Sequence, residues 1–87
     1  MKTAFVTGGS RGIGSAIALA LGKTFHVIVG FANSEDKAND VVKEIVSTGG
    51  SASAVQIDIS DAESVDNAFT SIEKEYNSVD VLILSLI

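Results

Sequence analysis

Apolar residues form four short runs along the chain, and each run has the length and composition of a β-strand. The runs cover residues 3–7, 26–31, 53–59 and 79–87. Strands that are covered on both faces read as continuous apolar runs, whereas half-exposed strands alternate apolar and polar residues. The pattern predicts four strands, of which the first is buried.

Between these runs the apolar residues recur every three or four positions, which is the spacing of an amphipathic helix. The three stripes are Ile13, Ile17, Ala20 and Leu21; Ala38, Val41, Val42 and Ile45; and Val65, Ala68, Phe69, Ile72 and Tyr76. Gly22 is a plausible end for the first helix, and either Asn33 or Ser34 is a suitable N-cap for the second. Ser60 and Glu63 have the spacing of a capping box before the third.

The predicted element order is therefore βαβαβαβ, which is typical of an α/β fold. Alternating strands and helices with short connections predict a doubly wound parallel sheet with helices on both faces. The expected strand order is 3-2-1-4, as in the first half of such a sheet. Ligands of these folds bind beyond the carboxyl ends of the strands, where the winding reverses.

A glycine cluster follows the first predicted strand and opens the first predicted helix. It consists of Gly8, Gly9, Gly12 and Gly14. Glycine lets the backbone approach a pyrophosphate closely, and a helix N-terminus presents free N–H groups to an anion. A simple turn is the alternative interpretation, but it does not need four glycines. The cluster therefore predicts a phosphate-binding turn.

Composition limits the classes of function. The chain has 87 residues, no cysteine and a formal net charge of −5, so residues 1–87 are expected to form a single domain. The low positive charge argues against nucleic-acid binding. The sequence contains neither a signal peptide nor an apolar span, so we expect a soluble, cytoplasmic protein without membrane contacts. The lone His26 has no second ligand at metal-binding spacing, which favours a structural role and no metal.

The segment TGGSRGIG at residues 7–14 resembles the TGxxxGxG cofactor motif of the short-chain dehydrogenase/reductase family. Downstream, DISD resembles the Asp-plus-apolar pair that contacts adenine in that family, and VDVLI resembles its fourth strand. Nearly all of the chain resembles the N-terminal portion of enzymes similar to 3-oxoacyl-[acyl-carrier-protein] reductase, an enzyme of fatty acid synthesis. The resemblance implies a partial Rossmann-type dinucleotide-binding domain and hydride transfer between NAD(P)H and a carbonyl or alcohol.

NADP(H) is expected in preference to NAD(H). NAD enzymes of this fold carry an acidic residue at the end of the second strand, roughly 20 residues past the glycines. Gly30 occupies that place, so no carboxylate repels a 2′-phosphate, whereas Arg11, Asn33 and Ser34 can donate to one. The predicted cofactor-binding residues are Gly8, Ser10, Arg11, Gly12, Ile13, Gly14, Asn33, Ser34, Asp58 and Ile59.

The chain departs from the family at its catalytic residues. Leu84 to Ile87 stand where the family has an Asn-Asn-Ala-Gly motif, and no catalytic Ser or Tyr-x-x-x-Lys pair is present. The single tyrosine, Tyr76, is followed four residues later by Asp80 and lies on an apolar stripe, which indicates packing. We therefore expect no catalytic residue. Two hypotheses remain, the cofactor-binding half of a reductase and a non-catalytic nucleotide-binding or assembly module left by truncation.

The fourth predicted strand is an edge strand in the order 3-2-1-4. It has no proline, and no charge follows Asp80. An apolar edge with unpaired backbone groups is a template for pairing with another chain. Residues 81–87 therefore predict a homo-oligomer or docking of the missing second half of the domain.

Overall fold

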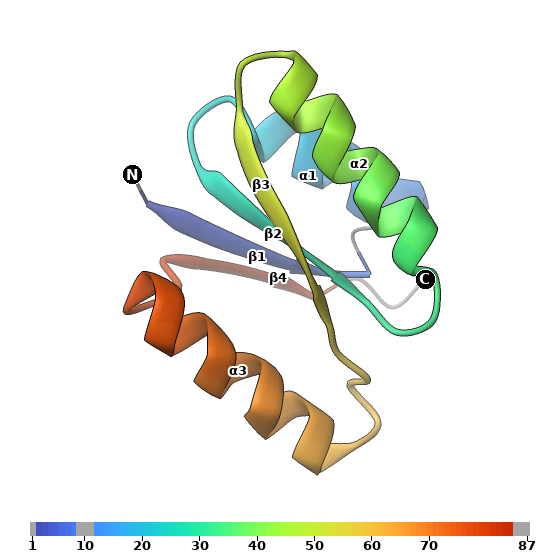
Figure 1. The fold of residues 1–87 in the computed structure, drawn as a ribbon, viewed down its shortest axis with the longest axis vertical. Helices are drawn as coiled ribbons and strands as arrows, with labels where there is room; N and C mark the ends of the chain where they lie inside the picture. Colours follow the sequence, from blue (N-terminus) through green and yellow to red (C-terminus); the bar gives the residue numbers. More distant parts are fainter. Residues whose placement is uncertain (1, 9–11, 85–87) are drawn as a thin grey trace.

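A computed structural model describes residues 2–8 and 12–84, and it has three layers (Figure 1). The elements are β1 (Thr3–Thr7), α1 (Gly12–Leu21), β2 (His26–Phe31), α2 (Glu35–Ser47), β3 (Ser51–Gln56), α3 (Ala62–Tyr76) and β4 (Val81–Leu84). All strands pair in parallel, in the order β3-β2-β1-β4. Helices α1 and α2 cover one face of the sheet and α3 covers the other. The predicted doubly wound α/β fold and its strand order are confirmed.

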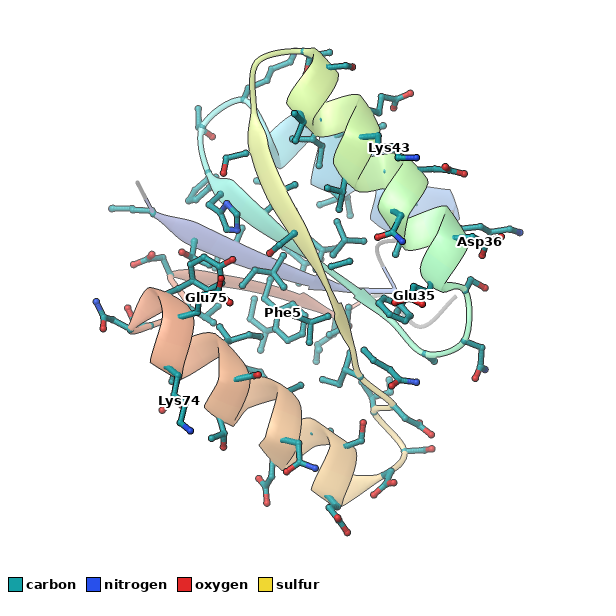
Figure 2. The ribbon with its side chains drawn as sticks, viewed as in Figure 1. Phe5, Glu35, Asp36, Lys43, Lys74 and Glu75 are labelled. Carbon is teal, nitrogen blue, oxygen red and sulfur yellow. The ribbon has the colours of Figure 1, made fainter. Side chains whose placement is uncertain are left out.

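The central strand β1 is buried along its whole length because both faces of the sheet are covered. Val6 belongs to the apolar cluster beneath α1 and α2, and its neighbour Phe5 belongs to the cluster beneath α3. The ring of Phe5 meets Phe69 of α3 edge-on, with ring centroids 5.4 Å apart. Figure 2 shows Phe5 in the space between the sheet and α3. Two separate cores therefore hold the three layers together.

Strand β3 is displaced from its predicted range of residues 53–59. It begins two residues earlier because Ser51 pairs with His26 in the sheet. It ends at Gln56 because Asp58 starts a turn. Ile57 lies outside the strand but is buried, and this is why the apolar pattern extends past the strand.

Strand β4 is shorter than the predicted range of residues 79–87. It begins after Asp80, whose N–H donates to the Thr3 carbonyl at 2.9 Å and whose Oδ2 accepts from the Thr3 N–H at 2.8 Å. Val79 packs against the α3 cluster instead of pairing in the sheet. Residues 85–87 lie outside the described part of the chain.

The predicted capping box of α3 is wrong by one residue. Asp61 is the N-cap, and its Oδ1 accepts from the Glu63 N–H at 3.0 Å. Ser60 instead donates its hydroxyl and its N–H to Oδ1 of Asp58. In α2 the N-cap is Ser34, although its side chain makes no capping hydrogen bond. Within residues 2–8 and 12–84 no helix is long and apolar enough to cross a membrane.

His26 and Tyr76 form a polar cluster at the amino ends of the strands. The two rings stack with centroids 4.7 Å apart, and the His26 ring also hydrogen-bonds to the hydroxyls of Ser51 and Ser53. The Ser53 hydroxyl lies 3.1 Å from the Tyr76 hydroxyl. Burial lowers the pKa of His26, and the charge of Glu75 opposes this effect. Both rings therefore have packing roles, and in the described residues no cluster of metal ligands forms.

Candidate functional site

The carboxyl edge of the sheet gathers the predicted site residues. Parallel strands end at the same edge, and the turns that follow β1, β2 and β3, together with the first turn of α1, carry all eight of the predicted residues that the structure describes. These residues are Gly8, Gly12, Ile13, Gly14, Asn33, Ser34, Asp58 and Ile59. Ser10 and Arg11 lie outside the described residues. The topology thus brings three distant segments of the sequence to one side of the fold.

The β1–α1 turn is shaped for an anion. Gly8 has φ 68° and Gly12 has φ 61°, and both values lie in the left-handed region that favours glycine. A Cβ at Gly12 would have no atom within 4 Å, so the backbone there faces open space. The first turn of α1 contains no acidic residue. The described first turn of α1 therefore brings no carboxylate to the positive end of the helix dipole.

Gly30, which the sequence analysis placed where NAD enzymes carry an acidic residue, lies near the end of β2. Gly30 is buried inside the sheet, and a Cβ there would lie 2.9 Å from Cε1 of Phe5 and 3.1 Å from Cγ2 of Ile57. No side chain fits at this position, so Gly30 is glycine because of packing. The first exposed residue after β2 is Ala32, which also lacks a carboxylate. Neither Gly30 nor Ala32 thus places a carboxylate at the end of β2.

Two carboxylates at this turn have a significance that the sequence analysis did not assign. Glu35 and Asp36 occupy the first turn of α2, directly after Asn33 and Ser34, and both are exposed (Figure 2). Their sequence pattern indicates only a solvated helix start. Their place directly after Asn33 and Ser34, the predicted 2′-phosphate donors, was the one sequence feature that could have linked them to the site. The two carboxylates lower the affinity of this turn for an external anion such as a phosphate group.

The β3–α3 turn surrounds the Asp58 carboxylate with hydrogen-bond donors. Oδ1 of Asp58 accepts from the Ser60 hydroxyl at 2.6 Å and from the Ser60 N–H at 3.0 Å. The hydrogen bond from the hydroxyl, followed by that from the N–H, lowers the pKa of Asp58 below its usual range. The Asp58 N–H donates to the Ser64 hydroxyl at 2.9 Å, which fixes the turn. Both bonds from Ser60 fall on Oδ1, so Oδ2 remains suited to accept from an amino group.

Two large apolar side chains are exposed beside these polar groups. Ile13 on the first turn of α1 is 63% exposed, and Ile59 after β3 is 50% exposed. Exposed apolar side chains beside an anion-binding turn offer contact surfaces for flat rings. The carboxyl edge of the sheet therefore carries a glycine turn, the Asp58 carboxylate and two exposed apolar side chains, an arrangement that suits a dinucleotide.

A family model described as short chain dehydrogenase matches residues 2–85. The chain belongs to the short-chain dehydrogenase family. A 3-oxoacyl-[acyl-carrier-protein] reductase from Synechocystis is 43% identical to it over 83 residues, which cover 94% of this chain and 34% of the relative. The chain thus spans about a third of the length of the curated relatives that it matches.

Solved structures of this family share the fold. A dehydrogenase/reductase from Sinorhizobium meliloti superposes with a TM-score of 0.90 at 42% identity, over 97% of this chain and 34% of that one. A metagenomic short-chain oxidoreductase in complex with NADP gives 0.88 at 35% identity, over 93% and 37%. The resemblance seen in the sequence motifs is thereby confirmed.

Proposed function

We propose that residues 1–87 form one NADP(H)-binding domain of a short-chain dehydrogenase/reductase. The observation that carries this proposal is the open N-terminus of α1, where Gly12 has a positive φ and faces open space at the carboxyl edge. The NADP complex of a relative with the same fold supports the choice of cofactor. The lack of cysteine is compatible with a reducing compartment, and a cytoplasmic location is part of the proposal.

Each turn holds a different part of the cofactor in this proposal. The glycine turn and the N-terminus of α1 bind the pyrophosphate. Arg11, Asn33 and Ser34 donate to the 2′-phosphate. Asp58 accepts from the adenine amino group through Oδ2, and Ile59 packs against the ring. When bound, the nicotinamide supplies or accepts the hydride.

Titration of the purified chain with NADPH and NADH, followed by nicotinamide fluorescence, tests this assignment. We expect saturable binding with tighter affinity for NADPH. Gly12→Asn keeps a residue that tolerates positive φ, whereas Gly12→Asp also adds a negative charge, so the pair separates shape from charge. Absence of binding to both cofactors would contradict the proposal.

The whole-protein reaction is proposed to be hydride transfer between NADPH and a carbonyl such as a 3-oxoacyl thioester. The name of the Synechocystis relative supports this substrate class. The 87-residue chain alone is expected to bind cofactor without useful turnover. Its single tyrosine, Tyr76, stacks on His26 at the amino edge, opposite the site. Loss of a general acid alone costs about 10²–10⁴-fold in rate.

A non-catalytic nucleotide-binding or assembly module is the second candidate function, and the position of Tyr76 favours it for this chain. A turnover assay with a 3-oxoacyl thioester and NADPH tests this second candidate. Carbonyl reduction that Gly12→Asp abolishes would contradict it, whereas cofactor binding without reduction is expected both of a module and of the cofactor-binding half of a reductase.

We also propose that β4 pairs with a second copy of the chain. In the described residues no strand pairs with the outer edge of β4, and Leu82 and Leu84 are 46% and 62% exposed. The sheet register directs the N–H and C=O groups of Val81 and Ile83 toward β1, so those of Leu82 and Leu84 point outward. An antiparallel pair centred on Ile83 matches Leu82 of each copy with Leu84 of the other, so all eight outward groups form hydrogen bonds.

Sedimentation at micromolar concentration tests this pairing. We expect a dimer that Leu82→Lys converts to monomer. A monomeric wild-type chain would contradict the pairing, and it would indicate that a further segment of the same fold, such as the second half of the domain, covers β4. Lys74→Ala on the exposed surface of α3 is the control and is expected to leave the dimer intact.

A further inference from the structure

The side chain of Gln56 extends the hydrogen bonding between β2 and β3 by one residue beyond β2. The last backbone bond joins the Ile57 N–H to the Phe31 carbonyl at 2.8 Å. The next carbonyl, that of Ala32, accepts from Nε2 of Gln56 at 3.2 Å. A side chain on the edge strand thus holds the peptide that leads into the β2–α2 turn.

This bond also sets the direction of the Asn33 N–H. The carbonyl of Ala32 and the N–H of Asn33 belong to one peptide unit, and in a trans peptide the two groups point in opposite directions. The described residues contain no cis peptide bond. When the Ala32 carbonyl accepts from the Gln56 amide, the Asn33 N–H therefore points away from the Gln56 side chain.

The surroundings of Gln56 are polar and open. Gln56 and Asn39 line a cavity of about 460 Å³ together with Asn33 and Glu35. No hydrogen bond among the described residues engages the Asn33 N–H. Among the described residues, the peptide between Ala32 and Asn33 is therefore held by the Gln56 side chain, and its N–H is left without a protein acceptor.

We propose that Gln56 is a positioning residue for cofactor selection: it orients the Asn33 N–H as a donor to the 2′-phosphate of NADP(H). The inference rests on the proposed NADP(H) function. Gln56 does not contact the cofactor in this arrangement. Its effect is confined to ligands that carry the 2′-phosphate, because the Asn33 N–H has no role toward the rest of the dinucleotide.

The test uses Gln56→Met, which keeps the length of the side chain and removes its donor. We expect adenosine 2′,5′-bisphosphate and NADPH to bind about three- to tenfold more weakly, as for loss of one hydrogen bond. Adenosine 5′-monophosphate and NADH are expected to bind as in the wild type. Asn39→Met, which removes another amide from the same cavity, is the matched control and is expected to change neither.

An NMR titration supplies a second measurement, which would not change if Gln56 only stabilised the fold. In the wild type, adenosine 2′,5′-bisphosphate should shift the Asn33 amide resonance downfield more than the monophosphate does, and Gln56→Met should abolish this difference. Equal losses for ligands with and without the 2′-phosphate, or no loss, would overturn the role of Gln56. Absence of binding to all four ligands in the wild type would instead contradict the proposed function.

Discussion

Helices α1 and α3 both begin at the carboxyl edge of the sheet, and their first turns differ in charge. The first turn of α3 carries its own carboxylates, because Asp61 caps it and Glu63 follows. The first turn of α1 has neither an acidic residue nor a bulky side chain at Gly12. A helix that satisfies its N-terminus internally is stable without a ligand, whereas the described first turn of α1 supplies no carboxylate of its own and leaves charge compensation to an anion in the proposed site.

Helix α2 is intermediate between these two. Its N-cap Ser34 makes no side-chain hydrogen bond, yet Glu35 and Asp36 already supply negative charge. The three helix starts therefore form a series, from the first turn of α1, which has no carboxylate, to that of α3, which a carboxylate caps. We expect cofactor binding to depend on the start of α1, to be modulated by that of α2 and to be insensitive to that of α3.

The largest effect is expected for Gly12→Asp, which gives α1 the negative charge that the other two helices carry. Affinity for NADPH should fall about 100-fold or more, since like charges brought together cost several kcal/mol. Fluorescence titration measures this loss. Gly12→Asn is the control for shape and should lose considerably less. A similar loss in both variants would show that charge is not what distinguishes α1.

Arg11→Ala removes the positive charge that the motif places beside the phosphates. NADPH binding should weaken by about 1.5–3 kcal/mol, the range for a hydrogen bond to a charged group, while NADH binding stays nearly unchanged. Calorimetric titration with both cofactors measures the difference. Equal weakening of both would assign Arg11 to the shared pyrophosphate and remove its role in selection.

Asp61→Ala tests the closed cap of α3. The free energy of unfolding should fall by about 1 kcal/mol, because the Glu63 N–H loses its acceptor. Urea denaturation measures this change, and Asp61→Asn should retain most of the stability. NADPH affinity should stay constant in the folded protein. A drop in affinity would mean that α3 takes part in the site.

The smallest effect is expected for Glu35→Gln at the start of α2. Removing this charge should strengthen NADPH binding by about 0.3–1 kcal/mol and weaken the helix by a similar amount. The gain should diminish at high salt, because Glu35 is exposed. An equal gain in NADH affinity would indicate that Glu35 repels the phosphates common to both cofactors and not specifically the 2′-phosphate.

The fold was predictable because each element has a local signal. Short apolar runs and three-to-four spacing identify every strand and helix, and parallel α/β topology then fixes the edge at which the site lies. The ends of elements were less predictable. Ile57 extends the apolar pattern beyond β3 because it is buried by tertiary packing, and the serine and aspartate at residues 60 and 61 are both good caps that only the geometry of the turn distinguishes.

Sequence also identified the glycine turn and the Asp58 turn, but it misassigned the reason for Gly30. From the sequence, Gly30 stands where an NAD enzyme would have an acidic residue. In the structure, the side chains of Phe5 and Ile57 occupy the space that a Cβ at Gly30 would need. The bond between Gln56 and Ala32 had no sequence signal, because it joins residues 24 positions apart whose identities suggest only an exposed strand end and a turn.

The central place of β1 has a consequence for the order of folding. β1 is synthesised before both of its neighbours, β2 and β4, and the bond between Thr3 and Asp80 joins residues 77 positions apart. During synthesis β1 can pair with β2 early, while its other edge stays unpaired until residues 81–84 are made. A chain with such long-range pairing folds slowly and exposes an apolar edge in the meantime, so the nascent chain depends on chaperones more than a helical bundle of equal length does.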